Sequence, residues 1–175
     1  ENIAKVVKII GSIPISNPET GPFDINRIRE EVISRNEMKI LTPYDIVLLQ
    51  ELDYWNQLCL CMYMTMNDLL QALQGERGMN DQIEHTLQLL NEGSLPAVWM
   101  KYCPPTTKKL SSWMIHFKQR SEQYVSWVES GQPQVIWLSG LHSPQGFLSA
   151  LLQTVCRSKG WALDETVIHT EVTKW

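Results

Sequence analysis

Ser143, with His142 before it and glycines at positions 140 and 146, is the part of this chain closest to a catalytic motif. A nucleophile elbow has glycine two positions before and two positions after its serine, but Leu141 and Gln145 occupy those positions here. A serine followed by proline is instead typical of a helix start, because serine accepts from first-turn amides and proline fits the first helical position. We therefore expect Ser143 to cap a helix that begins at Pro144. A small hydrolase using Ser143 and a distant histidine is the catalytic alternative.

Residue types that bind metals or nucleotides also lack the spacing that a reaction centre requires. The four histidines form no H-E-x-x-H arrangement and no pair four residues apart. Cys59 and Cys61 with Met62, Met64 and Met66 could be taken as soft copper ligands, but their helical spacing favours packing. No G-x-x-x-x-G-K-[ST] phosphate loop occurs. We expect no catalytic, cofactor-binding or metal-ligating residues in this segment.

The composition describes a globular protein without a strongly basic character. The 175 residues are 43% hydrophobic, which is enough for a core, and the formal net charge is −4. Nucleic-acid-binding proteins concentrate lysine and arginine on one face, so no nucleic acid partner is expected. The longest apolar stretch, 58–64, is far shorter than the roughly 20 residues of a membrane span, so no membrane partner is expected. The cysteines lack C-x-x-C spacing and are predicted to be reduced thiols of an intracellular protein.

The longest predicted element is a helix over residues 42–74. Thr42 and Pro43 are typical of a helix start, Asp45 stands where a capping box has its acidic residue, and no later glycine or proline precedes Gly75. Apolar residues recur along it at alternating steps of about three and four. They are Leu48, Leu52, Trp55, Cys59, Met62, Met66, Leu70 and Leu73. This stripe predicts packing along the whole helix, and the nearly continuous apolar run at 58–66 predicts cover on more than one side.

Shorter helices are predicted before and after the long one. Asp24 and Asn80 are expected to cap two of them, because each precedes an apolar pattern of helical period. Another is expected to open at Thr106 or Thr107 and end near residue 129. The last is predicted over residues 144–159.

Extended structure is predicted only late in the sequence. Residues 135–138 are expected to be extended, and the alternation of apolar and polar residues at 166–172 predicts an edge strand. Residues 3–10 fit either a helix or a strand. The predicted fold class is mainly α, a multi-helix bundle with one long helix and short extended segments late in the sequence.

Charged residues on these helices are predicted to be solvated. No lysine or arginine occurs from Ile40 to Glu76, where several acidic residues do. A small basic group at positions 108, 109, 118 and 120 lies next to Trp113 and Trp127. Contact with an acidic protein surface is the alternative for this basic group.

Large side chains are expected to anchor the packing around the long helix. The apolar run that stops at Gly140 and restarts as a helix at Pro144 predicts a packed corner. The predicted structural residues are Trp55, Trp99, Trp113, Trp137, Gly140, Ser143, Pro144 and Phe147.

Several blocks of sequence are similar to one known family. They are residues 49–53 (LQELD), 69–75 with Met79 and Asn80, 95–99 (LPAVW), 110–113 (LSSW), 137–148, 159–164 (KGWALD) and 169–174. In this order, over residues 40–175, they resemble the C-terminal region of dynein heavy chains, most closely the axonemal kind. The sequence begins at Glu1 and stops at Trp175 in mid-pattern, so we take it to be a piece of a longer protein.

The resemblance implies a domain organisation and a function. It implies that residues 1–38 end the small helical subdomain of the sixth AAA+ module, and that residues 39–175 are the helical part of the dynein C-terminal domain, cut before its β-rich end. It further implies a non-catalytic structural and regulatory segment that supports the AAA+ motor ring in ATP-driven, microtubule-based movement of cilia and flagella. ATP and Mg are cofactors of the parent motor in this interpretation, with none in this segment.

The implied partners are the AAA+ ring of the same heavy chain and, through the parent complex, other dynein subunits and microtubules. The implied location is the cytoplasm and cytoskeleton, in a ciliary or flagellar axoneme. A stand-alone helical adaptor that binds partner helices through exposed apolar stripes is the alternative from another class.

Overall fold

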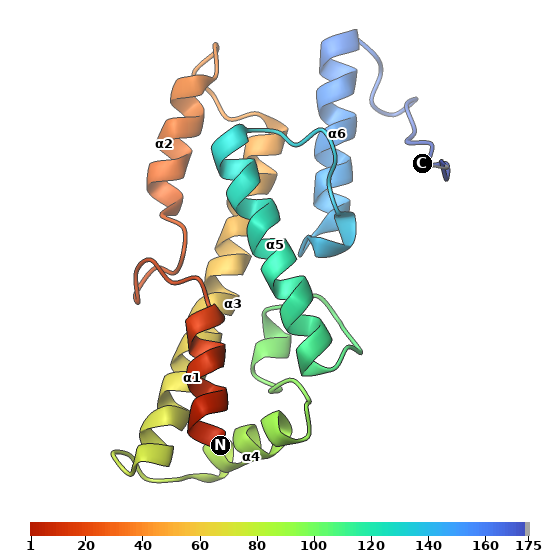
Figure 1. Ribbon diagram of the computed structural model, residues 1–175. Coiled ribbons are helices and arrows are strands. Elements are labelled where there is room, and N and C mark those ends of the chain that lie inside the picture. The colour runs from red at the N-terminus through yellow and green to blue at the C-terminus, as the bar shows by residue number, and fades with distance from the viewer. Residues whose placement is uncertain (174–175) are drawn as a thin grey trace.

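The fold is described by a computed structural model that covers residues 1–173 (Figure 1). Lys174 and Trp175 lie outside the described residues, and with them the end of the 169–174 block and of the predicted 39–175 segment. The described residues form six α-helices and two short 3-10 helices, with no strand among them. The prediction of a mainly α bundle with one long helix is confirmed.

The long helix α3 (Pro43–Gln74) begins and ends where local chemistry predicts. The amide of Asp45 donates to Thr42 Oγ1 at 3.3 Å, and the amide of Thr42 donates to Asp45 Oδ2 at 2.7 Å. These two bonds form the predicted capping box, with Pro43 at the start of the helix. Gly75 ends the helix with a φ of +79°, a left-handed conformation that glycine adopts without strain.

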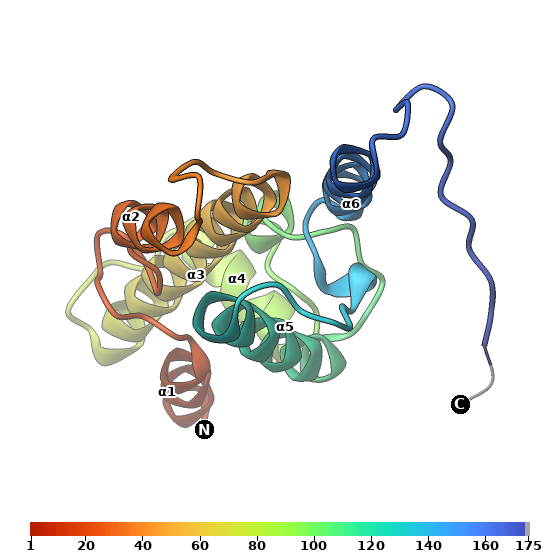
Figure 2. The ribbon, with the colours of Figure 1, turned by 90° about the horizontal axis from the view of Figure 1, so that it is seen from above.

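The other helices pack around α3, and each of them contacts it. They are α1 (Asn2–Ser12), α2 (Ile25–Arg35), α4 (Asp81–Asn91), α5 (Leu110–Ser130) and α6 (Pro144–Lys159). Seen from above, α6 lies on the side of the molecule away from α1 and α2 (Figure 2). Leu58, Cys59, Met62 and Met66 have no exposed surface. The prediction that the middle of α3 is covered on more than one side is therefore confirmed.

Two other predicted helix starts are also confirmed. The amide of Arg27 donates to Asp24 Oδ1 at 3.0 Å at the start of α2, and the amide of Ile83 donates to Asn80 Oδ1 at 2.9 Å at the start of α4. Each side chain satisfies an amide that has no partner within its helix. The ambiguous residues 3–10 are helical and form most of α1.

The start of α5 is later than predicted. Thr106 Oγ1 accepts from the Lys108 amide at 3.2 Å, so this threonine stabilises a local turn and not a helix. The helix begins at Leu110, whose amide donates to the carbonyl of Gly93 at 2.9 Å. A contact with the glycine just after α4 therefore fixes the start of α5.

The two predicted extended segments do not form strands. Residues 135–138 lead into the 3-10 helix η2 (Leu138–Gly140), and residues 166–172 are irregular and mostly exposed. A strand needs a neighbour for its backbone amide and carbonyl groups, and the described residues give neither segment such a neighbour. The alternation of residues 166–172 was therefore not sufficient to predict a strand.

The first part of the chain shares its core with α3. Asn56, buried on α3, donates from Nδ2 to the carbonyl of Phe23 at 2.8 Å and accepts from the Phe23 amide at 3.0 Å. Gly21 has a φ of +91°, and a Cβ at this position would lie 3.0 Å from Asn56. These contacts attach the loop before α2 to the long helix. The domain boundary near residue 38 stays a prediction.

Candidate functional site

Glu51 is the most deeply buried acidic residue of the long helix, with 1% of its surface exposed. It lies on α3 in the same stripe as Leu48, Leu52 and Trp55, all of which are buried. A carboxylate in such a place destabilises the fold strongly unless hydrogen bonds satisfy its oxygens. The prediction that the charges of this helix are solvated is wrong for Glu51.

Hydrogen bonds from two other parts of the protein satisfy this carboxylate. The hydroxyl of Tyr124, on α5, donates to Glu51 Oε2 at 2.6 Å. The amide of His142 donates to the same oxygen at 2.7 Å, and the amide of Ser143 donates to Oε1 at 2.7 Å. One side chain of α3 therefore holds both α5 and the start of α6.

The start of α6 uses Glu51 where a capping side chain is expected. Ser143 takes the N-cap position and Pro144 follows it in the first turn, as predicted, but the Ser143 hydroxyl makes no capping hydrogen bond. Its side chain is exposed. The prediction gives the N-cap position correctly, but the group that caps the helix is the carboxylate of Glu51 and not the hydroxyl of Ser143. A negative charge at a helix N-terminus is also stabilised by the helix dipole, so Glu51 suits this place electrostatically.

Arg120 supplies a buried positive charge beside the same corner. It is 6% exposed, and its Nε donates to the carbonyl of Gly140 at 2.7 Å. The guanidinium carbon lies 5.1 Å from the ring centroid of Trp55, within the range of a cation–π contact. The prediction of a solvated basic face on this helix is wrong for Arg120. Its charge offsets part of the charge of Glu51 within the core.

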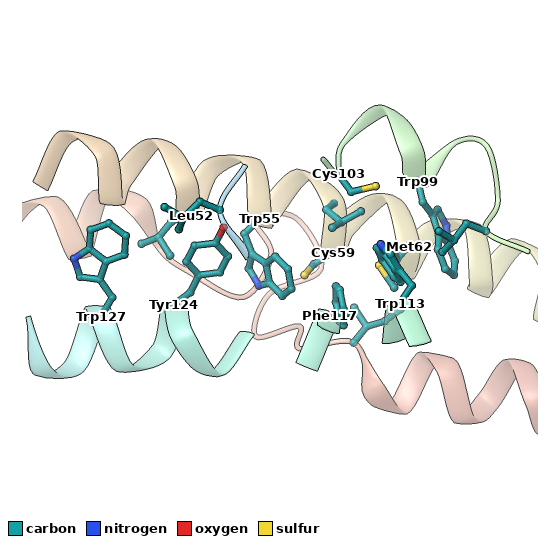
Figure 3. Packing of buried hydrophobic residues seen from close by; sticks show 14 of the residues in the cluster. Leu52, Trp55, Cys59, Met62, Trp99, Cys103, Trp113, Phe117, Tyr124 and Trp127 are labelled. Carbon is teal, nitrogen blue, oxygen red and sulfur yellow. The ribbon is translucent and has the colours of Figure 1, made fainter. Parts of the chain in front are cut away.

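Tyr124 lies between these two charges. Burial raises the pKa of its hydroxyl well above the ordinary value of 10.0, and the negative charge of Glu51 raises it further while Arg120 lowers it. The hydroxyl is therefore neutral at physiological pH and donates its proton to Glu51. Figure 3 shows its oxygen directed from α5 toward α3.

His142 is packed against the outside of this network. Its ring stacks on that of Tyr54 with centroids 3.9 Å apart and an interplanar angle of 16°. Its Nδ1 is buried and has no hydrogen-bond partner among the described residues. Burial lowers the pKa of His142, Arg120 lowers it further, and Glu51 opposes both. The stacked imidazole is neutral, and no described hydrogen bond joins it to the hydroxyl of Ser143.

Gly140 and Trp137 form the close contact of the predicted corner. A Cβ at Gly140 would lie 2.5 Å from Cε3 of the Trp137 ring, so no larger residue fits without a shift. Gln123 holds the backbone of Trp137, accepting from its amide at 2.8 Å. The ring is only half-buried and meets His116 edge to face, with centroids 5.2 Å apart. Trp137 therefore anchors the corner to α5, whereas the sequence predicts it as an anchor of the long helix.

Three other predicted anchors, Trp55, Trp99 and Trp113, lie with Phe117 in a continuous aromatic layer (Figure 3). The layer is formed by α3, α5 and the 3-10 helix η1 (Trp99–Lys101). Trp55 stacks on Phe117 with centroids 4.6 Å apart, and Phe117 stacks on Trp113 at 5.4 Å. Trp113 in turn meets Trp99 at 5.9 Å. All four rings are at least 95% buried. Offset and tilted aromatic pairs of this kind add to the stability from burial alone.

Phe147 joins α6 to α3 and α5 through two further aromatic rings. Its ring centroid lies 5.7 Å from that of Tyr44 on α3 and 5.7 Å from that of Trp127 on α5. It is 6% exposed. Phe147 therefore fixes the first turn of α6 next to the hydrogen bonds that Glu51 makes to the same turn.

Sulfur-containing side chains in the middle of α3 are part of the core. Cys59, Met62 and Met66 are fully buried, whereas Met64 is 63% exposed. Burial raises the pKa of the Cys59 thiol, with Arg120 opposing. Among residues 1–173 no three His, Cys, Asp or Glu side chains gather as metal ligands would. Over the same residues, no helix has both the length and the apolar surface for a membrane crossing.

Only part of this site could be found from sequence. The aromatic residues and Gly140 were expected to be structural, but Glu51, Arg120 and Tyr124 were not recognised as one network. The sequence did contain one sign of this network, the positions of its two charged residues. Glu51 and Arg120 each fall within an apolar stripe of helical period.

The described residues thus define a class, a helical domain organised around one long helix with a satisfied polar network at its centre. The protein belongs to the family formed by the C-terminal domain of dynein heavy chains, whose family model matches residues 1–175. The resemblance inferred from the sequence blocks is therefore confirmed.

Individual relatives agree with the family match. The chain is 43% identical over 154 residues to the dynein-1-alpha heavy chain of the flagellar inner arm I1 complex of Chlamydomonas reinhardtii, an alignment covering 88% of this chain. It is 38% identical over 161 residues, 92% of this chain, to dynein axonemal heavy chain 10 of Homo sapiens. It is 35% identical over 153 residues, 87% of this chain, to the dynein beta chain of the flagellar outer arm of Chlamydomonas reinhardtii. The aligned residues span only 3% to 4% of the length of these relatives.

Proposed function

We propose that this protein is a non-catalytic structural and regulatory segment of an axonemal dynein heavy chain. In this role it supports the AAA+ motor ring during ATP-driven movement along microtubules in cilia and flagella. ATP and Mg belong to the parent motor, and the direct partner is the ring of the same heavy chain. Other dynein subunits and microtubules are reached through the parent complex, in the cytoplasm and the axonemal cytoskeleton.

The observation that carries this proposal is the position of Glu51. A single carboxylate in the long helix holds Tyr124 of α5 and the first amides of α6, so displacing any of these helices breaks hydrogen bonds to a buried charge. Such bonds are costly to break, since an unsatisfied buried charge is left behind. In such a segment a displacement of one helix is passed on to the others, which suits a segment that supports the motor ring.

The sequence and the family support the same proposal. No phosphate loop occurs in the sequence, and the relatives reported above are named as dynein chains. Family membership thus favours a part of a motor over a stand-alone adaptor. We propose further that residues 1–38 end the sixth AAA+ module and that residues 39–175 belong to the C-terminal domain.

The test uses the parent heavy chain with Glu51→Ala. Loss of this support should slow microtubule gliding several-fold while the ring continues to hydrolyse ATP. Glu84→Ala, which removes an exposed carboxylate from α4, is the matched control and should leave both rates unchanged. If the Glu51→Ala motor does not assemble, Tyr124→Phe makes the milder change at the same contact. Gliding at the wild-type rate in both variants, or ATP hydrolysis by this segment alone, would contradict the proposal.

A further inference from the structure

A groove with an apolar floor runs between α1 and α5. The two helices lie on the same side of α3 (Figure 2). Its volume is about 1010 Å³, and Ile9, Leu90 and Phe117 form its floor. Met114 is half-buried in its wall and Ile115 is 62% exposed at its edge. Apolar surface gathered in an open groove is typical of a binding site for another molecule.

Lysines surround this floor. Lys5 and Lys8 project from α1 and Lys118 from α5, and no acidic side chain is among the described residues that line the groove. Lys5 donates to the carbonyl of Leu90 at the edge of the floor. Lys118 is 3.8 Å from Glu122, one turn further along α5, but both side chains are exposed and such pairs are weak. The groove is thus locally positive in a protein whose formal net charge is −4.

The shape and the charge together select one kind of occupant. An apolar floor takes apolar side chains that recur on one face, and the lysines on the rim pair with carboxylates beside that face. The volume of the groove lies at the upper limit of the usual size of a small-molecule pocket, which favours a polypeptide segment. Nucleic acid would use the lysines but has no need of the apolar floor.

We propose that the groove between α1 and α5 docks an amphipathic helix of a partner protein, with its apolar stripe on the floor and its acidic residues against Lys5, Lys8 and Lys118. The adaptable side chain of Met114 suits such a contact, since methionine fills irregular apolar surfaces. This inference rests on the groove alone and does not require the motor role proposed above. It also gives Lys118 the acidic protein partner that the sequence left open for its basic group.

The experiment measures the binding of two synthetic helical peptides by fluorescence anisotropy. Both peptides have about 18 residues, or five helical turns, with leucines at helical spacing; one carries glutamates beside the leucines and the other carries lysines there. The acidic peptide should bind this protein about tenfold or more tightly than the basic peptide, with an affinity that falls as salt is raised.

Variants then locate the binding surface. Lys8→Glu with Lys118→Glu should weaken the acidic peptide about tenfold and strengthen the basic one. Ile115→Glu should weaken the acidic peptide by placing a carboxylate at the edge of the apolar floor. The matched control, Arg157→Glu with Lys159→Glu, makes the same change of net charge on exposed positions of α6 and should bind as the wild type does. Circular dichroism checks that each variant folds.

Three results would overturn the proposal. The first is no difference in binding between the two peptides, or an undiminished affinity of the groove variant for the acidic peptide. The second is binding of a single-stranded oligonucleotide that depends on the same lysines and is unchanged by Ile115→Glu. In that case the site recognises phosphates. The third is self-association that the groove variant abolishes, because the occupant is then a second copy of this protein.

Discussion

The hydroxyl of Tyr124 donates a 2.6 Å hydrogen bond to Glu51 across 73 positions of the sequence. Neither side chain is exposed by more than 1%. The same carboxylate accepts from the amides that open α6, so the contact between α3 and α5 and the start of α6 depend on one another. Hydrogen bonds to a buried charge contribute more than neutral ones, so the loss of any of these donors should destabilise the protein.

Tyr124→Phe should therefore destabilise the protein. The ring and its packing remain, while Glu51 loses one of its donors, at a cost of about 1.5 to 3 kcal/mol in the free energy of unfolding. Urea unfolding followed by tryptophan fluorescence measures this change. Tyr63→Phe is the matched control, because the Tyr63 hydroxyl has no hydrogen bond among the described residues and its loss should cost less than about 0.5 kcal/mol. Equal costs for the two variants would contradict the role given to Tyr124.

Gly140→Ala should also be destabilising, and for a steric reason. The new methyl group would lie 2.5 Å from Trp137 Cε3, and such overpacking costs about 1 to 3 kcal/mol. Trp137→Leu in the same protein should recover part of the loss, since the two residues are in direct contact. Gly78→Ala provides the control, because a Cβ there meets nothing within 4 Å. Thermal unfolding of Gly140→Ala, Trp137→Leu and the double variant measures the coupling between the two residues. A cost at Gly140 no greater than that of Gly78→Ala would refute the steric explanation.

Alanine substitutions of the two N-cap residues Thr42 and Ser143 should differ in their effect on the free energy of unfolding. Thr42 Oγ1 accepts the amide of Asp45, so Thr42→Ala should cost about 1 kcal/mol. The Ser143 hydroxyl makes no capping bond, so Ser143→Ala should change the free energy of unfolding by less than about 0.5 kcal/mol. Chemical denaturation of the two variants compares them directly. A larger cost at Ser143 than at Thr42 would show that the serine caps α6 after all.

Local chemistry made most of the helices predictable. The capping box at Thr42, the caps at Asp24 and Asn80, and the glycine that ends α3 each depend on residues a few positions apart, and all were correctly placed. The prediction of a strand at 166–172 was wrong because strand formation depends on residues far away in the sequence. An extended segment becomes a strand only when a distant segment pairs with it, and alternation alone does not reveal that partner.

The polar network was missed because its partners are distant in sequence. Glu51 follows Leu48 by three positions and precedes Trp55 by four, so it faces the core, yet its donors are 73 to 92 positions away. Arg120 falls in the same way between Phe117 and Tyr124 on the buried face of α5. Charge alone predicted solvated faces for both residues. Their position in the apolar stripes was the better guide, since a charge there must find partners.

His142 should make the stability of the protein depend on pH. Burial lowers the pKa of His142 in the folded state below the ordinary value of 6.5, with Arg120 adding to this effect and Glu51 opposing it. In the unfolded state the pKa returns to about 6.5, so the unfolded state binds the proton more readily. The stability that neutral His142 contributes is therefore complete above that pH and is lost as the pH falls through the lowered folded-state pKa. Urea unfolding of the wild type at about pH 7.5 and about pH 5.5 should show this loss, and His142→Asn should reduce it. His85→Asn, an exposed site on α4, should retain the wild-type loss, and an unchanged loss in His142→Asn would exclude His142 as its source.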